Sequence, residues 1–273
     1  MGSRQQTPEY LLGRGLIESI RLDAQHTLFR LHNGYCLHPR VPVKDDMKIA
    51  EIGTGTAIWL FDLARQLPPT VQLDGFDISD QQFPHQSLWP SNVHLDILDS
   101  LTEAPGRLVG QYDVVHIRLW TSVIRGNDPG PLIRHASSLL KPGGYIQWDD
   151  ANLEKHTVKG KAAERFEKIV QHCWQVMDID HRWLLDLPHR VEEHGFTLLD
   201  SYEGEFAPDL IQLCTNTYLV ILFGMLEVVK AGPEGKILPS ISECSESLQA
   251  VYTETRYGGS FHWPPVTVFA QKK

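Results

Sequence analysis

The chain has 273 residues, with 25 Lys and Arg against 34 Asp and Glu, so its formal net charge is -9. Hydrophobic residues make up 42% and charged residues 22%, which excludes a largely disordered chain and allows one large domain or two small ones. An acidic chain without a Lys/Arg cluster is a poor partner for a phosphate backbone, so we expect no nucleic-acid binding.

In chain order, a helical segment over residues 8–33 comes first. Short apolar runs then alternate with helical stretches, which predicts βαβ units and a parallel sheet. The predicted strands are 47–53, 71–79, 92–98, 112–120 and 145–150, with helices over 56–67 and 129–140 and a KPGG turn at 141–144. Beyond them we expect an interrupted helix over 160–194, a strand at 196–206, helices over 209–230 and 242–256, and a closing strand at 266–271.

The cysteines and the longest apolar run bear on compartment and assembly. No two of the cysteines have the CxxC spacing of a zinc or redox site (Cys36, Cys173, Cys214 and Cys244), so we expect reduced thiols. With no apolar secretory signal visible at the N-terminus, we predict a cytoplasmic protein. The run from Tyr218 to Val229 is shorter than the roughly 20 residues that cross a bilayer, so we expect no membrane span. It predicts a buried helix, a lid or a subunit interface, and so allows a homodimer.

A glycine-rich loop follows the first predicted strand, in the stretch IAEIGTGTAIWL (49–60). Gly53 and Gly55 form a tight turn that opens a helix, where unpaired N–H groups and close backbone approach favour a ligand. A nicotinamide site has its third glycine at the position of Ile58, whereas an S-adenosylmethionine (SAM) loop has it at Ala57. Neither glycine is present. Glu51 belongs to the SAM pattern and therefore favours SAM.

A second ligand signal is Asp77, at the end of the second predicted strand. A carboxylate at this edge of an open sheet can accept hydrogen bonds from both ribose hydroxyls. Nicotinamide sites use the same device, so Asp77 indicates a nucleoside ligand without choosing between the two cofactors.

Together, the motifs EIGTGT, DGFDIS, NVHLDILD, YDVVHIRL and LLKPGGYIQWDD resemble, in order and spacing, the class I SAM-dependent methyltransferases. The flanking segments YLLGRGLIESIRLDAQHTLF, GYCLHP and IRLW are similar to fungal secondary-metabolite methyltransferases of the LaeA-like and UMTA-like group, and within it to O-methyltransferases of meleagrin/oxaline-type indole alkaloid pathways. The resemblance covers residues 8–150 well and 160–271 by general layout.

The resemblance implies an α/β fold with a Rossmann-like sheet of seven strands, mostly parallel with the last antiparallel. N-terminal helices and an inserted helical cap complete it. We expect one domain over 1–273, divided into an N-terminal cover (8–46), a SAM-binding core (47–150), and a part that completes the sheet and caps the substrate (151–273).

The family's cofactor residues carry over onto matching positions. Glu51, Gly53, Thr54 and Gly55 would hold the methionine part of SAM, Asp77 the ribose, and Ile78 the adenine. Asp99 would meet the adenine amino group beside Ile97 and Leu98. His116 and Arg118 would lie beside the methyl donor, and Tyr10 and Arg21 in the N-terminal cover.

For chemistry, an alcohol or phenol acceptor needs a base, and the candidates are His116, Asp149, Asp150 and His262. His116 comes first by position; a histidine held structurally is the alternative. Of Asp149 and Asp150, one should face the pocket and one the solvent, because strand side chains alternate. No third ligand joins this pair at a suitable spacing, so we predict no metal. Tyr218, Phe223, His262 and Trp263 are the expected substrate contacts.

These observations predict a SAM-dependent methyltransferase that methylates a hydroxyl, on nitrogen or a phenol, of a bulky small-molecule natural product such as an indole alkaloid. Two alternatives stay open: a SAM-fold pericyclase or lyase, and a regulatory protein of the LaeA-like kind.

Overall fold

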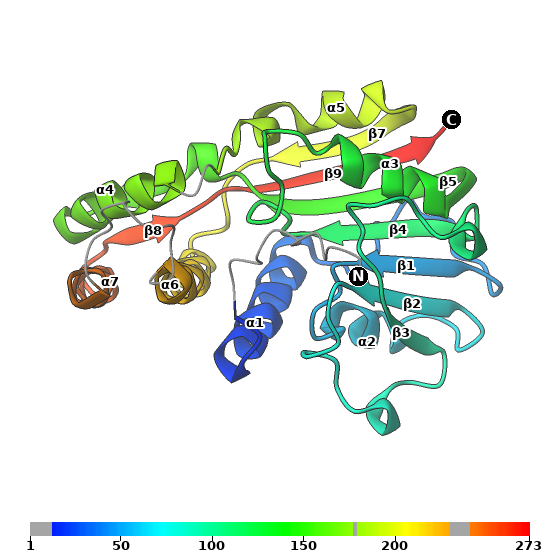
Figure 1. Ribbon diagram of the computed structural model, residues 1–273, viewed down its shortest axis with the longest axis horizontal. Coiled ribbons are helices and arrows are strands. Elements are labelled where there is room, and N and C mark those ends of the chain that lie inside the picture. The colour runs from blue at the N-terminus through cyan, green and yellow to red at the C-terminus, as the bar shows by residue number, and fades with distance from the viewer. Residues whose placement is uncertain (1–12, 177–178, 230–240) are drawn as a thin grey trace, which may run out of the picture.

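The computed structural model describes residues 13–176, 179–229 and 241–273. Within them, seven strands form one sheet in the order β3-β2-β1-β4-β5-β9-β7 (Figure 1). All neighbours are parallel except β9, which runs antiparallel to both β5 and β7. The predicted mostly parallel sheet with an antiparallel last strand is confirmed. The strands are β1 Lys48–Ile52, β2 Gln72–Asp77, β3 Val93–Ile97, β4 Tyr112–Arg118, β5 Leu140–Ala151, β7 Phe196–Glu203 and β9 Pro265–Lys272.

Alternation along the strands gives the sheet two buried faces. On β1 and β4, Ala50 and Val115 belong to one apolar cluster, whereas Ile49 and Val114 belong to another. Helices α3 (Gly130–Leu139) and α5 (Leu187–Glu193) supply the first cluster, together with the 3-10 turns η2 (Gly106–Leu108) and η4 (Arg182–Asp186). Helix α2 (Ile58–Ala64) supplies the second. Both faces are therefore covered, as is usual for a parallel sheet.

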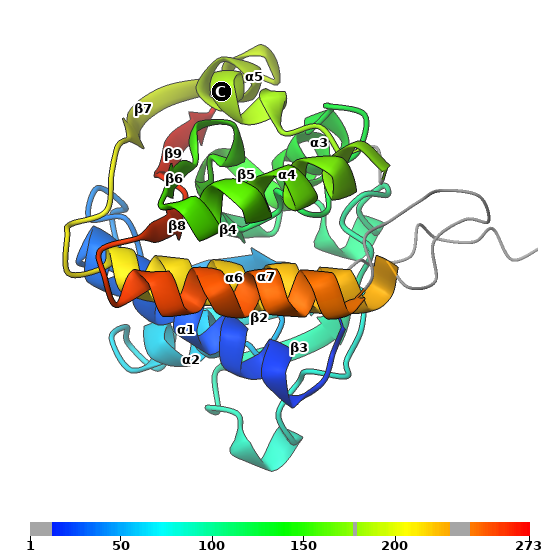
Figure 2. The ribbon, with the colours of Figure 1, turned by 90° about the vertical axis from the view of Figure 1, so that its left-hand side faces the viewer.

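A helical cap lies beyond the carboxyl ends of the parallel strands. Helix α6 (Ile211–Val229) packs against α1 (Leu16–Asn33) and α7 (Ile241–Thr255), and α7 packs against α4 (Lys161–Val176) (Figure 2). Its core is rich in aromatic residues, including Phe166, Tyr218 and Trp263. The apolar run that starts at Tyr218 is therefore at least partly explained by burial within the cap. No helix in the described ranges is long and apolar enough to cross a membrane.

Two local features differ from expectation. β5 begins at Leu140 and runs through the KPGG segment, predicted as a turn, because Gly143 takes a left-handed φ of 74° and the register with β4 shifts there. A two-stranded sheet of β6 (Thr157–Lys159) and β8 (Ser260–His262) was not predicted, since three residues are too few to show a pattern. The remaining 3-10 turns are η1 (Gln86–Leu88) and η3 (Leu153–Lys155).

Candidate active site

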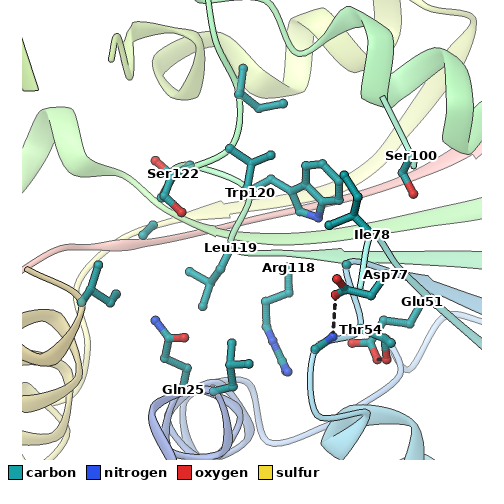
Figure 3. A pocket seen from close by; sticks show the side chains of 18 of the residues that line it. Gln25, Glu51, Thr54, Asp77, Ile78, Ser100, Arg118, Leu119, Trp120 and Ser122 are labelled. Carbon is teal, nitrogen blue, oxygen red and sulfur yellow. Dashed lines mark hydrogen bonds between the residues drawn. The ribbon is translucent and has the colours of Figure 1, made fainter. Parts of the chain in front are cut away.

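A cavity of about 420 Å³ lies between the carboxyl ends of the strands and the cap (Figure 3). One half is built by the loops that follow β1, β2 and β3. The other half is built by α1, the segment after β4, and the cap helices α4 and α6. Of the predicted cofactor residues, those that line it are Arg21, Glu51, Gly53, Thr54, Gly55, Asp77, Ile78, Leu98, Asp99 and Arg118.

The glycine loop depends on left-handed backbone conformations. Gly53 has a φ of 74° and Gly55 a φ of 55°, and a Cβ on Gly53 would lie 2.9 Å from the Trp120 ring. Ala57, where the family pattern has its third glycine, takes the same left-handed conformation with a φ of 59° as the N-cap of α2. The loop therefore keeps the glycine-type backbone although alanine replaces glycine.

Asp77 closes the loop from the neighbouring strand. Its carboxylate accepts hydrogen bonds from the N–H of Gly55 at 2.9 Å and from the N–H of Ser79 at 3.3 Å. Burial nevertheless holds the pKa of this carboxyl above its ordinary value, outweighing those bonds. A carboxylate has about four acceptor sites, so acceptor capacity remains for two ribose hydroxyls.

Arginine side chains line the cavity, among them Arg21 and Arg118. Arg21 of α1 pairs with Glu18 at 2.7 Å. Arg118, the last residue of β4, points into the cavity, and its Nη1 lies 3.1 Å from Nδ1 of His26 (Figure 3). Burial first, and then the Arg118 charge, lowers the pKa of His26 to about 4, so this ring is neutral and accepts the bond.

Two predicted cofactor residues do not line the cavity. Ile97 is 55% exposed at the end of β3 and does not line the cavity; the next residue, Leu98, does. His116 is also absent from the lining. Tyr10 lies outside the described residues.

The expectation that a predicted base faces the cavity is wrong. His116, Asp149 and Asp150 are at most 2% exposed and none of them lines the cavity. His116 lies within β4 rather than at its end. Its side chain points to the face of the sheet that α2 covers, where it lies between Glu51 and Asp149. Asp150 points to the opposite face and accepts bonds from the Trp148 ring and the Trp120 backbone, so neither aspartate faces solvent.

The acceptor half of the cavity is aromatic and apolar. Trp174, Tyr218 and Trp263 line it, together with Leu119 and Leu153. The Tyr218 hydroxyl is buried without a hydrogen-bond partner in the described chain, and burial raises its pKa. Among the described lining residues, Thr121 and Tyr218 carry such an unpaired buried hydroxyl.

Two predicted substrate contacts are not in this half. Phe223 is 42% exposed on α6 and does not line the cavity. His262 belongs to β8 and is 4% exposed, with Nε2 lying 3.5 Å from Glu205. The apolar run predicted that α6 is buried, but it did not predict which face of the helix lines the cavity.

Several lining residues were not predicted: Gln25, Ser100, Leu119, Trp120, Ser122 and Trp174. Gln25 lies one helical turn after Arg21 and accepts a bond from it at 2.7 Å, so helical spacing could have indicated it. Leu119 has a φ of 56°, which turns the chain sharply at the end of β4. The sequence carries no signal for that turn.

One further group gathers ligand-type atoms beneath α1. One nitrogen, sulfur or oxygen atom from each of three residues lies within 4.8 Å of the other two; the residues are His26, Cys36 and Asp62. The Asp62 carboxylate already accepts bonds from four side chains: Arg30 at 2.8 Å, Gln66 at 2.9 Å, and His26 and Cys36 each at 3.0 Å. Because a guanidinium cation occupies the carboxylate, we interpret the group as an ion-pair network between α1 and α2.

Comparison with known proteins identifies the family. A family model described as a methyltransferase domain matches residues 32–201, more than half of the chain. The chain is 34% identical over 252 residues to the N-methyltransferase tcpN of Claviceps purpurea, covering 83% of each chain. It is 37% identical over 159 residues to the methyltransferase grgD of Penicillium sp., about half the length of each (55%). It is also 25% identical over 191 residues to the secondary metabolism regulator LAE1 of Hypocrea atroviridis, covering 66% of this chain and 53% of that one.

Solved structures agree on the fold. A candidate sarcosine dimethylglycine methyltransferase from Galdieria sulphuraria superposes with a TM-score of 0.50 at 14% identity, covering 97% of this chain and 94% of that one. The MccD protein gives a TM-score of 0.53 at 9% identity, covering 92% and 96%. At these identities the likeness concerns the fold alone.

The cavity fits the methyl donor of this family. The left-handed glycine loop admits close backbone approach, Asp77 has acceptor capacity for a ribose, and Ile78 and Leu98 supply apolar surface for a base. The chain therefore belongs to the class I methyltransferase family, with S-adenosylmethionine as its cofactor.

Proposed function

We propose that the protein transfers a methyl group from SAM to a nitrogen atom of a bulky, largely apolar natural product. The observation that carries this proposal is the composition of the cavity wall. Among the described lining residues there is no histidine, and the carboxylates are Glu51, Asp77, Asp99 and Asp128. Glu51 and Asp77 lie at the carboxyl ends of β1 and β2, and Asp99 follows β3. Asp128 accepts the Gly130 N–H at 2.8 Å, where α3 begins.

A nitrogen acceptor suits such a wall. A neutral amine carries a lone pair and needs no base in the attacking step, whereas an alcohol or phenol usually needs one within hydrogen-bond reach. The relatives tcpN, verN and sirN are all named N-methyltransferases, which supports the same choice. Our sequence-based expectation of a hydroxyl acceptor becomes the second candidate, for a hydroxyl acidic enough to ionise in solution.

The bound cofactor supplies an electrophilic methyl group on a sulfonium centre. The chain positions and shields the acceptor: Trp174, Tyr218 and Trp263 exclude water, and Leu119 lies between the two halves of the cavity (Figure 3). Orientation of two reactants can supply about 7–11 kcal/mol of barrier lowering, so this wall accounts for rate without a side-chain base.

The test uses SAM labelled with ¹³C in its methyl group and matched indole-bearing acceptors that carry an amine, an N-hydroxyl or a phenol. The carbon chemical shift of the product separates N-methyl from O-methyl. We expect the amine to be methylated. Transfer to the hydroxyl acceptors alone would overturn the nitrogen assignment, and a rearranged but unmethylated product would favour a cyclase or lyase.

A further inference from the structure

His116 lies between two carboxylates at the back of the cofactor loop. Its Nδ1 is 3.1 Å from Oε1 of Glu51, and its Nε2 is 3.4 Å from Oδ2 of Asp149. Strand register explains the arrangement, because Glu51 of β1 is paired with His116 of β4 and β5 carries Asp149 on the same face. Glu51 lines the cavity, whereas the other two residues lie behind it.

The contacts determine how many protons the imidazole ring carries. A neutral imidazole has one N–H and would direct the lone pair of its other nitrogen at a carboxylate. An imidazolium donates to both. The charged groups in contact with the ring are these two carboxylates, from β1 and β5, and the ring itself is 0% exposed. Arg118 lies two residues along β4 on the same face, and its guanidinium contacts His26.

The surroundings favour the cation and keep Asp149 ionised. Trp59 of α2 stacks on the ring at a centroid distance of 3.9 Å and an angle of 6°, and an indole face attracts a cation. Asp149 also accepts bonds from Asn33, Gln147 and Thr267. Burial acts to raise the pKa of Asp149, but the bonds it accepts outweigh burial and lower it.

Glu51 is the member of this group that meets the cofactor site. One of its oxygens accepts from His116 and the other accepts from Thr54 Oγ1 at 2.6 Å. Each oxygen keeps a second acceptor site, which a donor in the cavity can use. Because both oxygens of Glu51 are already held in place, the side chain loses little rotational freedom when a ligand binds to it.

We propose that His116 is a buried imidazolium that positions the Glu51 carboxylate in the cofactor site, and is therefore a positioning residue and not the methyl-transfer base. Asp149 contacts the other ring nitrogen and is the second negative charge that stabilises the protonated ring. The inference concerns the cofactor site and is independent of whether nitrogen or oxygen is methylated.

The direct test is ¹⁵N NMR of the unliganded protein labelled at histidine, because the ring-nitrogen signals report how many protons the imidazole carries. His116→Gln assigns the signal. We expect both ring nitrogens of His116 to carry protons, with a neutral ring for His135, a buried histidine whose pKa is lowered by burial. A neutral His116 ring would overturn the proposal whatever the variants do.

Calorimetry of SAM binding tests the functional half. His116→Gln should weaken SAM binding about tenfold, equivalent to about 1.4 kcal/mol, and leave kcat at saturating SAM nearly unchanged. His135→Gln is the matched control and should bind as the native chain does. Equal SAM affinity in the folded His116→Gln variant would overturn the positioning role, whereas a native chain that does not bind SAM would overturn the cofactor assignment itself.

Discussion

At the scale of single residues, the position of Asp77 at the cavity has a cost in stability. Burial holds its pKa above the ordinary value, so the folded chain binds this proton more tightly than the unfolded chain. Stability therefore falls as pH rises through the two pKa values, and the ionised carboxylate destabilises the unliganded protein at neutral pH.

We predict that Asp77→Asn weakens SAM binding by at least about tenfold, because the amide cannot accept from both ribose hydroxyls and the loop together. The unliganded variant should be no less stable than the native chain at neutral pH. Calorimetry and urea unfolding measure the two effects. Asp45→Asn, at an exposed turn, is the control for both. If the variant bound SAM as tightly as the native chain, Asp77 would not be a ribose contact.

The unpaired Tyr218 hydroxyl gives a second prediction. Tyr218→Phe should leave the unliganded protein at least as stable, by up to about 1 kcal/mol, because an unsatisfied buried group is removed. Its KM for the acceptor should rise several-fold while SAM affinity stays unchanged.

Tyr112→Phe is the contrasting variant, because the buried Tyr112 hydroxyl donates to Asp74 at 2.8 Å. It should destabilise by about 1–2 kcal/mol. A loss of stability in Tyr218→Phe as large as this would mean that its hydroxyl already has a partner.

At the residue level, a local motif carries enough geometry for the sequence to indicate which residues gather at the cavity. Ten predicted cofactor residues line the cavity, because short loops after parallel strands meet at one edge. Prediction failed for His116, Asp149 and Asp150. Their positions depend on where each strand ends and which face each side chain takes, and these follow from register between strands distant in sequence.

At the scale of elements, the start of α2 depends on three left-handed residues. Gly55→Ala should cost about 1–2 kcal/mol, since its φ is 55° and the new Cβ would lie 2.8 Å from Leu22. Ala57→Gly is expected to change stability by less than about 1 kcal/mol, because relief of its left-handed strain offsets the lost buried methyl. Thermal and urea unfolding measure both. A strongly destabilised Ala57→Gly would show that methyl packing outweighs backbone strain.

The contact between α1 and α2 should make stability depend on pH. The pKa of His26 is about 4 in the folded chain, so between about pH 6.5 and pH 4 the unfolded chain binds a proton that the folded chain does not. Stability therefore falls as pH is lowered through this window.

His26→Gln should reduce that fall, measured by urea unfolding at several pH values. Part of the fall in stability should remain in this variant, because burial also lowers the pKa of His181 to about 4. His189→Gln, on an exposed side chain of α5, is the control. An unchanged slope in His26→Gln would contradict the neutral state of His26.

Element order was largely predictable, because buried strands and amphipathic helices have different periods. The main strands and α2, α3 and α6 lie within a few residues of the predicted ranges. The extension of β5 through the KPGG segment was not predictable from the sequence. The register between β5 and β4 is irregular there, and this irregularity accommodates the turn residues within the strand.

At the scale of the whole molecule, the C-terminal part completes the sheet rather than forming a separate unit. Val266, Val268 and Ala270 of β9 belong to the same apolar cluster as Ile52 and Ile146. We propose that the chain is one domain, and predict that a fragment ending at residue 151 does not fold, because β5 loses its neighbour and the cluster is opened. Circular dichroism and amide NMR check this; a cooperative unfolding transition in the fragment would contradict it.

The position of β9 also has a consequence for synthesis on the ribosome. Tyr145 pairs with Gln271, and β7 joins the sheet only through β9. β9 is therefore inserted between two strands that were translated earlier, and each of those has an open edge until β9 has been synthesised. Sequence-distant pairing of this kind slows folding and exposes unpaired edges to other chains. Aggregation during expression should therefore depend on how soon β9 pairs with β5 and β7 after they have been translated.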